Sequence, residues 1–267
     1  MGKGVGFIGL GTMGLPFASN IASAGFDLMV YDLRPEPLDQ LHKLGAKIGE
    51  SARDVAEYSD VVHIAVPHEA EVDATLQGEE GVFAGAAPGT VIALHSSIHP
   101  ANMRRVAEEA RAHGVEILDT QMSGGARGVI NHTLCFMVGG DEAALAKCRP
   151  MLETTGSAIF HMGPVGTGAL TKVAQNTMTS MHLAVAAEVF RFAEKAGIEP
   201  RRFEEVVKAS AAQSHVADTY LDSWAPRDLK WMYYEVLEDA LQLAREVDSP
   251  LPGAALAQQV LATILRK

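Results

Sequence analysis

The chain has 267 residues, enough for one large domain or two modest ones with a substantial buried core. Hydrophobic residues make up 48% of it and charged residues 21%, as in ordinary folded proteins and unlike disordered or collagen-like chains. A net charge of −11 disfavours nucleic acid or an anionic membrane as a partner, and without a signal peptide or an apolar run of about 18 residues we expect a cytoplasmic protein.

Strands and helices alternate along the first part of the sequence. An apolar run up to Ile8, a glycine-rich turn, an amphipathic segment and a strand at residues 26–32 form one βαβ unit of about 30 residues. Ser51 is expected to cap a helix over residues 52–58. Further strands are expected at residues 60–67, 90–94, 115–119, 133–140 and 157–163. This alternation predicts a doubly wound parallel sheet of the Rossmann type.

The pattern changes after Gly168. Apolar residues then recur at helical spacing, and helices are expected at residues 169–195, 201–211, 229–247 and 253–265, without a convincing strand. We therefore predict a dinucleotide-binding domain over residues 1–162 and an all-helical substrate and oligomerisation domain over residues 163–267. A helical domain of about 100 residues is small for an independent core, so we expect a homodimer or a homotetramer.

The first motif with chemical content is Gly9-x-Gly11-x-x-Gly14, between a predicted strand and a predicted helix. The first glycine permits the turn, the second lets a pyrophosphate approach the backbone, and the third lets helix and strand pack closely. Asp32 ends the next strand, where a carboxylate accepts hydrogen bonds from an adenosine ribose and repels a 2′-phosphate. NAD is therefore favoured, although Arg34 keeps NADP open. The simpler alternative is a tight turn without a ligand.

The second motif is the sequence DTQMSGG, in which Ser123, Gly124 and Gly125 follow the strand that ends near Asp119. A hydroxyl group and two unhindered backbone N–H groups at the carboxyl edge of a parallel sheet suit a carboxylate. A plain turn is the alternative.

The third motif is GPVGTGALTKVAQN, which places Lys172 and Asn176 on one predicted helix. Residues four apart lie about 40° apart around a helix and about 6 Å apart along it, so both side chains can reach one small ligand. Lysine can polarise an oxygen or transfer a proton if its pKa is lowered. A lysine that extends its amine to water is the alternative.

Taken together, the three motifs resemble the β-hydroxyacid dehydrogenase family. The resemblance covers nearly the whole chain, from GFIGLGTMGLPFASNIASAGFDLMVYD through DTQMSGG and GPVGTGALTKVAQN to SPLP near Ser249. It implies hydride transfer between a nicotinamide cofactor and a 3-hydroxy acid or its semialdehyde.

The resemblance also implies residue roles. Lys172 would be the general acid/base, Asn176 would position the substrate, and Ser123, Gly124 and Gly125 would hold its carboxylate. Ser97 shares with Ser96 the place of a small hydroxyl residue near the nicotinamide. The implied cofactor-binding residues are Gly9, Gly11, Thr12, Met13, Gly14, Asp32, Val66, Pro67 and Ser96.

Several positions depart from the family pattern. Glu235-Val236 stands where a Lys-Asp pair is usual, residues 120–122 read Thr-Gln-Met instead of Ala-Pro-Val, and His132 replaces a common glycine. The second domain is also shorter than usual. It carries a cluster of aromatic residues, expected to pack in the core or at a dimer contact: Trp224, Trp231, Tyr233 and Tyr234.

Two alternative functions remain beside the dehydrogenase. Imine reduction is one, although imine reductases usually replace the lysine that is present here as Lys172. The other is a non-catalytic nucleotide-binding protein with an altered substrate site, which Glu235 favours and Lys172 disfavours. No metal is expected, because His95 and His99 do not share a helix and no cysteine-rich set exists.

Overall fold

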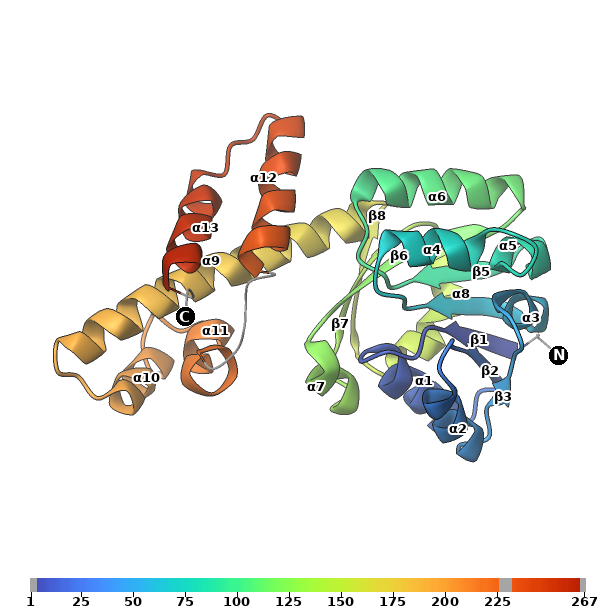
Figure 1. Cartoon of the computed structure of the whole chain (residues 1–267), viewed down its shortest axis with the longest axis horizontal. Coiled ribbons are helices and arrows are strands. Elements are labelled where there is room, and N and C mark those ends of the chain that lie inside the picture. Colours follow the sequence, from blue (N-terminus) through green and yellow to red (C-terminus); the bar gives the residue numbers. More distant parts are fainter. Residues whose placement is uncertain (1–3, 226–231, 265–267) are drawn as a thin grey trace. The chain divides into compact units, whose positions relative to one another are not determined.

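A computed structural model of the chain describes residues 4–225 and 232–264. The chain forms two compact units, Met1–Lys172 and Val173–Lys267 (Figure 1). The division falls within one helix, whereas the sequence predicts a boundary between residues 162 and 163. That boundary stays a prediction.

The described part of the first unit holds a sheet of eight strands in the order β3-β2-β1-β4-β5-β6-β7-β8. The strands are β1 (Gly4–Ile8), β2 (Leu28–Tyr31), β3 (Lys47–Ile48), β4 (Ser59–Ile64), β5 (Val91–Leu94), β6 (Glu116–Ser123), β7 (Cys135–Gly139) and β8 (Ala158–Gly163). The predicted Rossmann-type fold is confirmed.

One strand departs from the parallel arrangement. β7 runs antiparallel to β6, with Ser123 opposite Cys135, while the other neighbouring strands pair in parallel. The link between β6 and β7, residues 124–134, is shorter than the dozen or so residues that a parallel crossover needs. The chain therefore turns back through the short helix α7 (Gly125–Ile130).

Helices cover both faces of the sheet (Figure 1). They are α1 (Gly14–Ser23), α2 (Pro35–Lys43), α3 (Ala52–Tyr58), α4 (Glu69–Leu76), α5 (Val82–Gly85), α6 (Pro100–Ala112), α7 (Gly125–Ile130) and α8 (Glu142–Glu153). As predicted, Ser51 caps α3, because its side chain accepts a hydrogen bond from the Asp54 N–H.

Successive residues of the central strands belong to two separate cores. Phe7 lies in the core that includes Phe17 and Leu145, whereas Ile8 lies in the core that includes Val55 and Met103. Strands buried on both faces read as continuous apolar runs, which is why these strands were recognisable in the sequence.

All the regular elements among the described residues of the second unit are helices, joined by turns. It contains most of α9 (Thr167–Lys195), then α10 (Pro200–Lys208), α11 (His215–Asp218), two π-helical segments, η1 (Tyr220–Trp224) and η2 (Met232–Val236), α12 (Leu237–Glu246) and α13 (Pro252–Ile264). The helix expected at residues 229–247 begins outside the described residues and continues as η2 and α12. The all-helical second domain is confirmed.

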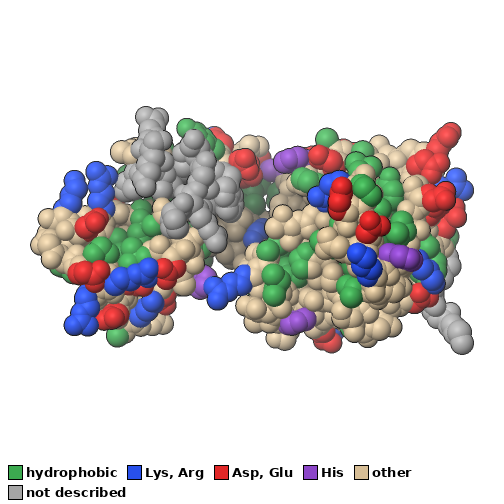
Figure 2. Space-filling model, turned by 60° about the horizontal axis from the view of Figure 1, so that its bottom comes forward, with side chains coloured by type: hydrophobic (Ala, Val, Ile, Leu, Met, Phe, Trp, Pro, Cys, Tyr) green, Lys and Arg blue, Asp and Glu red, His purple; other side chains and the backbone are tan. Residues whose placement is uncertain are grey.

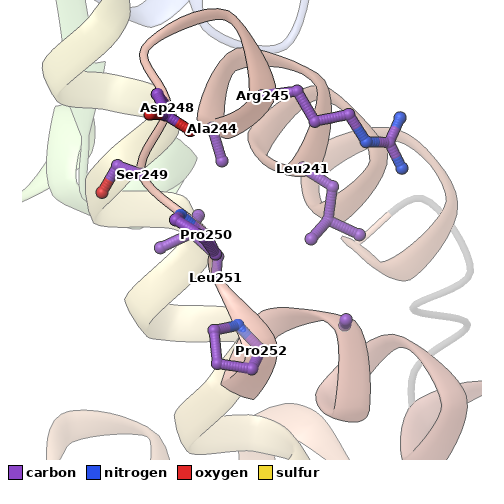
Figure 3. A pocket seen from close by; sticks show the side chains of 9 residues that line it. Leu241, Ala244, Arg245, Asp248, Ser249, Pro250, Leu251 and Pro252 are labelled. Carbon is purple, nitrogen blue, oxygen red and sulfur yellow. The ribbon is translucent and has the colours of Figure 1, made fainter.

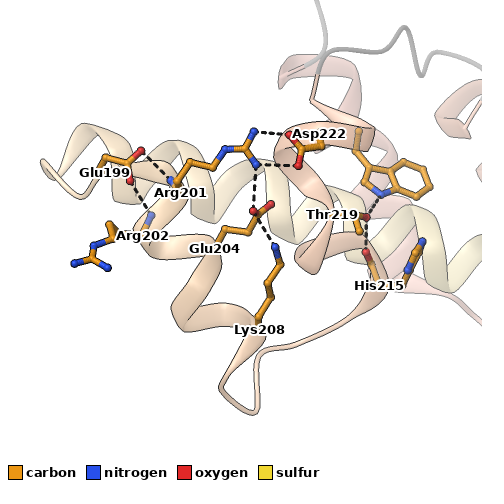
Figure 4. Close-up of polar contacts among 9 residues, drawn as sticks. Glu199, Arg201, Arg202, Glu204, Lys208, His215, Thr219 and Asp222 are labelled. Atoms are coloured by element: carbon orange, nitrogen blue, oxygen red, sulfur yellow. Dashed lines mark hydrogen bonds and ion pairs between the residues drawn. The ribbon is translucent and has the colours of Figure 1, made fainter.

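An ion pair links α10 to η1. Arg201 pairs with Asp222 and with Glu204, a buried carboxylate that also accepts a hydrogen bond from Lys208 at 3.1 Å (Figure 4). On the face that Figure 2 draws, acidic and basic side chains lie beside one another in the same way.

Near the end of the chain, a surface cavity of about 450 Å³ lies between α12 and α13. Figure 3 shows Arg245 and Leu241 of α12 on one side and the turn from Asp248 to Pro252 on the other. Among the described residues, no helix is long and apolar enough to span a bilayer.

Candidate active site

The predicted cofactor and carboxylate loops lie at one edge of the sheet. β2, β1, β4, β5 and β6 are neighbours and run in parallel, so their carboxyl ends meet at the same edge. The strand order reverses between β1 and β4, and ligands of open α/β sheets bind at such a reversal. The loops after these strands hold the sequence-predicted residues from Gly9 to Gly125.

The turn between β1 and α1 requires its glycines. Gly9 has φ +88°, and a Cβ atom there would lie 2.5 Å from the Ala65 carbonyl oxygen. A Cβ atom at Gly14 would lie 1.9 Å from the Gly9 oxygen, whereas Gly11 has no atom within 4 Å of its Cβ position. The turn thus has no room for a side chain at Gly9 or Gly14, whereas the space around Gly11 is open, which fits the close approach of a pyrophosphate.

Two further residues of this turn were predicted to bind the cofactor. Thr12 is exposed, and Met13 is half-buried against the core beneath α1. Both precede the first turn of α1, in which the Leu15 N–H donates to the Gly11 carbonyl oxygen at 3.1 Å and Pro16 has no N–H.

Asp32 is held at the end of β2 with its side chain only 9% exposed. Its Oδ2 accepts a hydrogen bond from the Leu10 N–H at 2.6 Å, and its Oδ1 accepts one from the Arg34 Nε at 2.9 Å. Burial opposes ionisation, but the hydrogen bonds from Arg34 and Leu10 outweigh it and keep the pKa of Asp32 below its ordinary value. A fixed carboxylate therefore lies beside the glycine turn.

The side chain of Ser96, in the loop after β5, forms hydrogen bonds with the loop after β4. The Ser96 hydroxyl donates to the Val66 carbonyl at 2.8 Å and accepts from the Val66 N–H at 3.1 Å. Ser96 is buried, while Pro67 and Ser97 are exposed.

Ser123 ends β6, and Gly124 and Gly125 lead into α7. Gly124 has φ +129° and Gly125 has φ +61°, a region of backbone conformation that favours glycine. No atom lies within 4 Å of the Cβ position of Gly125. Ser123 is half-buried and faces the same side of the sheet as Cys135, its antiparallel partner.

Lys172 lies in the second turn of α9, at the end of the first unit. Burial lowers the pKa of its amine to about 8, and the nearby Cys135 opposes that change slightly. Burial in turn raises the pKa of the Cys135 thiol, against the influence of Lys172. A lysine with this pKa exchanges a proton near neutral pH, as a general acid/base requires.

Asn176 follows Lys172 one turn later on α9, with a half-buried side chain. It belongs to the second unit. Both side chains lie on one continuous helix, as the sequence predicts.

Asp119 is a buried residue that the sequence reading treated only as the end of a strand. Its side chain has no exposed surface, and its Oδ2 accepts hydrogen bonds from the N–H groups of Gly166 at 3.1 Å and Ala169 at 2.7 Å. Burial raises its pKa, although these hydrogen bonds oppose the rise. The expected end of this strand near Asp119 was wrong, because β6 continues to Ser123 through residues that pair with β7. The available signal was a carboxylate directly after Ile117 and Leu118.

Two of the histidines, His63 and His95, form a buried pair. His63 Nδ1 lies 2.9 Å from His95 Nε2, and His95 Nδ1 lies 2.9 Å from the Thr120 carbonyl oxygen. Burial lowers the pKa of both rings, that of His95 to about 4. Within residues 4–225 and 232–264, no group of three histidine, cysteine or acidic residues is arranged to hold a metal ion.

The predicted aromatic cluster lies partly outside the described residues, since Trp231 and the side chain of Tyr233 belong there. Trp224 is half-buried and donates to Thr219 Oγ1 at 3.0 Å, whereas Tyr234 is 59% exposed. Glu235, at the usual lysine position, is exposed.

Two family models together match nearly the whole chain. Residues 4–163 match the NAD-binding domain of 6-phosphogluconate dehydrogenase, and residues 166–267 match the model described as NAD-binding of NADP-dependent 3-hydroxyisobutyrate dehydrogenase. The chain belongs to the 3-hydroxyisobutyrate dehydrogenase, or β-hydroxyacid dehydrogenase, family. It is therefore an enzyme of the NAD(P)-dependent 3-hydroxyacid dehydrogenase family, as the sequence predicts.

Relatives within this dehydrogenase family align over most of the chain. NAD-dependent L-serine dehydrogenase of Pseudomonas aeruginosa is 37% identical over 82% of this chain and 73% of its own length. The 2-hydroxy-3-oxopropionate reductase of Escherichia coli is 35% identical over 97% of this chain and 90% of its own. The solved structure of Mycobacterium tuberculosis 3-hydroxyisobutyrate dehydrogenase with L-serine has a TM-score of 0.85 and 28% identity, over 98% of this chain and 94% of that one.

Proposed function

We propose that this chain transfers a hydride between NAD and a small 3-hydroxy acid or its semialdehyde, with Lys172 as the general acid/base. The observation that carries the proposal is the half-buried Lys172 on α9, whose amine is shielded enough to lower its pKa to about 8, a value that suits proton transfer at neutral pH. Relatives named for L-serine and 3-hydroxyisobutyrate make these two acids the first substrates to assay.

The residues at the sheet edge fit a dinucleotide. The open backbone at Gly11 would receive the pyrophosphate, and the Asp32 carboxylate would accept hydrogen bonds from the ribose hydroxyl groups. The loops that Ser96 joins, with Val66 and Pro67, would flank the nicotinamide. The bound nicotinamide supplies the acceptor or donor of the hydride.

NAD is favoured over NADP because the ionised Asp32 repels a 2′-phosphate. Arg34 supports this preference, since its guanidinium is engaged by Asp32 and by the Leu10 carbonyl oxygen at 2.9 Å. NADP remains possible because the Arg34 side chain is 57% exposed and can turn toward a phosphate.

The chain's own chemical task is to hold the acid and to move one proton. The Ser123 hydroxyl and the N–H groups of Gly124 and Gly125 would bind the substrate carboxylate, and the Asn176 amide would orient the hydroxyl group. During oxidation the neutral amine of Lys172 accepts the hydroxyl proton, and during reduction its protonated form returns one. Positioning of the reacting groups supplies much of the remaining rate.

We also propose that two or four copies of the chain assemble through α9. Val185, Val189 and Phe192 recur at helical spacing with exposed fractions of 61%, 41% and 69%. An apolar stripe of this kind marks a contact with another protein surface. A cytoplasmic location stays part of the proposal.

The test is a panel of 3-hydroxy acids assayed with NAD and with NADP, followed by the near-ultraviolet absorbance of the reduced nicotinamide. Lys172→Ala should abolish turnover and leave cofactor affinity nearly unchanged, while Lys195→Ala, an exposed lysine on the same helix, serves as the matched control. An active Lys172→Ala enzyme would contradict the proposed role of the lysine. Turnover of cyclic imines alone, or of no compound, would contradict the proposed substrate class.

A further inference from the structure

Gln121 connects two parts of the candidate site. It lies in β6 with 1% of its surface exposed. Its Nε2 donates to Asp119 Oδ1 at 3.0 Å and to the Ser96 carbonyl oxygen at 3.1 Å, and its Oε1 accepts from Ser97 Oγ at 3.3 Å. A single buried amide thus links the loop after β5 to the Asp119 carboxylate.

The surroundings of the amide fix its orientation. The Ser96 carbonyl and the Asp119 carboxylate are acceptors only, so the two hydrogens of the Gln121 NH₂ group must face them. The remaining oxygen then faces the Ser97 hydroxyl group, which can donate. Each polar atom of the Gln121 side chain therefore has a partner of the right kind.

From Asp119 the hydrogen bonds continue to the start of α9. Asp119 Oδ2 accepts the N–H groups of Gly166 and Ala169, and a Cβ atom at Gly168 would lie 2.5 Å from the Asp119 carbonyl oxygen. The first turn of α9 is therefore held against β6 by a carboxylate and by close backbone packing. Lys172 follows Ala169 by three residues on the same helix.

We propose that Gln121 is a positioning residue, which through Asp119 holds the first turn of α9 and so sets the place of the Lys172 amine relative to the Ser96–Ser97 loop. This inference rests on the proposed role of Lys172.

Loss of the amide removes hydrogen bonds from two buried oxygens. Asp119 Oδ1 and the Ser96 carbonyl oxygen each lose the donor that Gln121 supplies, while Asp119 Oδ2 keeps the N–H groups of Gly166 and Ala169. A buried carboxylate that loses one of its donors rotates or admits water, because an unpaired oxygen costs more than the hydrogen bond it replaces. Either change loosens α9 around Lys172 and lets water reach the amine.

The experiment compares Gln121→Met with Thr120→Val. Methionine keeps the length of the side chain and removes its polar atoms. Thr120 is the matched control, because it is the neighbouring buried residue of β6 and its Oγ1 donates only to the Leu118 carbonyl oxygen at 3.3 Å. The two variants separate a positioning role from a general loss of stability.

The first readout needs no activity. Trace acetylation with acetic anhydride, measured on the Lys172 peptide by mass spectrometry across pH, gives the midpoint at which the amine becomes reactive. The wild-type midpoint is expected near pH 8. Gln121→Met should raise it by about one pH unit and lower kcat for oxidation at pH 7 about tenfold, with much of the loss recovered at high pH. Thr120→Val should leave both unchanged.

A folded Gln121→Met protein with the wild-type midpoint and kcat would overturn the inference. If that variant does not fold, Ser97→Ala takes its place, because it removes only the hydrogen bond from the exposed Ser97 hydroxyl group to Gln121. A smaller rise in the labelling midpoint of Lys172 would support the inference, and an unchanged midpoint would contradict it. If the wild-type protein oxidises no hydroxy acid, the proposed function fails, and the labelling midpoints still test the link between Gln121 and Lys172.

Discussion

Replacing Lys172 with methionine should remove activity and stabilise the folded chain at the same time. Methionine fills similar space without an amine, so the change removes a charge that burial disfavours. The pKa of about 8 is lower than that of an ordinary lysine because the amine is largely shielded from water. The folded protein thus loses stability by burying the amine that we propose as the proton-transfer group.

The same pKa sets the pH dependence of the reaction. At pH 7 a group with a pKa of about 8 is neutral in about one molecule in ten, against about one in 3,000 for an ordinary lysine. If neutral Lys172 is the base, kcat for oxidation should rise about tenfold from pH 7 to pH 9 and then level off. The reverse reduction needs the protonated amine, so its rate should fall over the same range.

The stability effect has a defined sign. Between the folded pKa of about 8 and the ordinary value of 10.5, the unfolded chain binds more protons, so the free energy of unfolding rises with pH. Below pH 8 both states are protonated and the cost of burial is present in full. Lys172→Met should therefore melt a few degrees above the wild type at pH 7, and the difference should shrink toward pH 10.5.

Thermal unfolding at pH 7 and at pH 10, with steady-state rates across pH, measures both effects. Lys195→Met is the control, because this exposed lysine lies on the same helix and should change neither melting nor rate. A rate that does not vary between pH 6.5 and 9.5, or a Lys172→Met variant less stable than the wild type at pH 7, would refute the reasoning.

Three further predictions concern other parts of the chain. Asp32→Ser should improve kcat/KM with NADP relative to NAD at least tenfold, because it removes the carboxylate that repels a 2′-phosphate; an unchanged ratio in steady-state assays would exclude that role. His132 has φ +57° and contacts the Thr154 carbonyl oxygen at 2.7 Å, so in denaturant unfolding His132→Gly should be about 1 kcal/mol more stable than His132→Ala, and equal stability would count against strain there. Phe192→Glu should reduce the oligomer in light scattering, whereas an unchanged mass would rule out α9 as the contact.

The parts of the fold that local patterns encode were predictable from the sequence. The turn at Gly9, the cap at Ser51 and the apolar central strands each depend on residues within a few positions of one another. The antiparallel β7 was not recognised, because an apolar strand has the same pattern in either direction and only the length of its link favours the reversal.

The connections around the site were less accessible to sequence reasoning. Asp119 bonds to Gly166 and Ala169, which are 47 and 50 residues away, and Gln121 bonds to Ser96, 25 residues away. No periodicity specifies such pairs, since they arise only when the sheet brings distant segments together. In the second unit, the helix expected at residues 229–247 contains a π-helical segment before α12, which a helical pattern alone does not reveal because it does not mark where the hydrogen bonding changes.

Because α9 is one continuous helix, an insertion or deletion within it changes the directions in which its side chains point. Each residue of an α-helix turns the chain by about 100°, so deleting one codon between Ala169 and Lys172 would point the amine to a different side of the helix. The change would also rotate every later position of α9, including Asn176. Single-residue insertions and deletions should therefore be absent from this stretch among functional descendants of the gene, while the exposed turn after Lys195 can gain or lose residues.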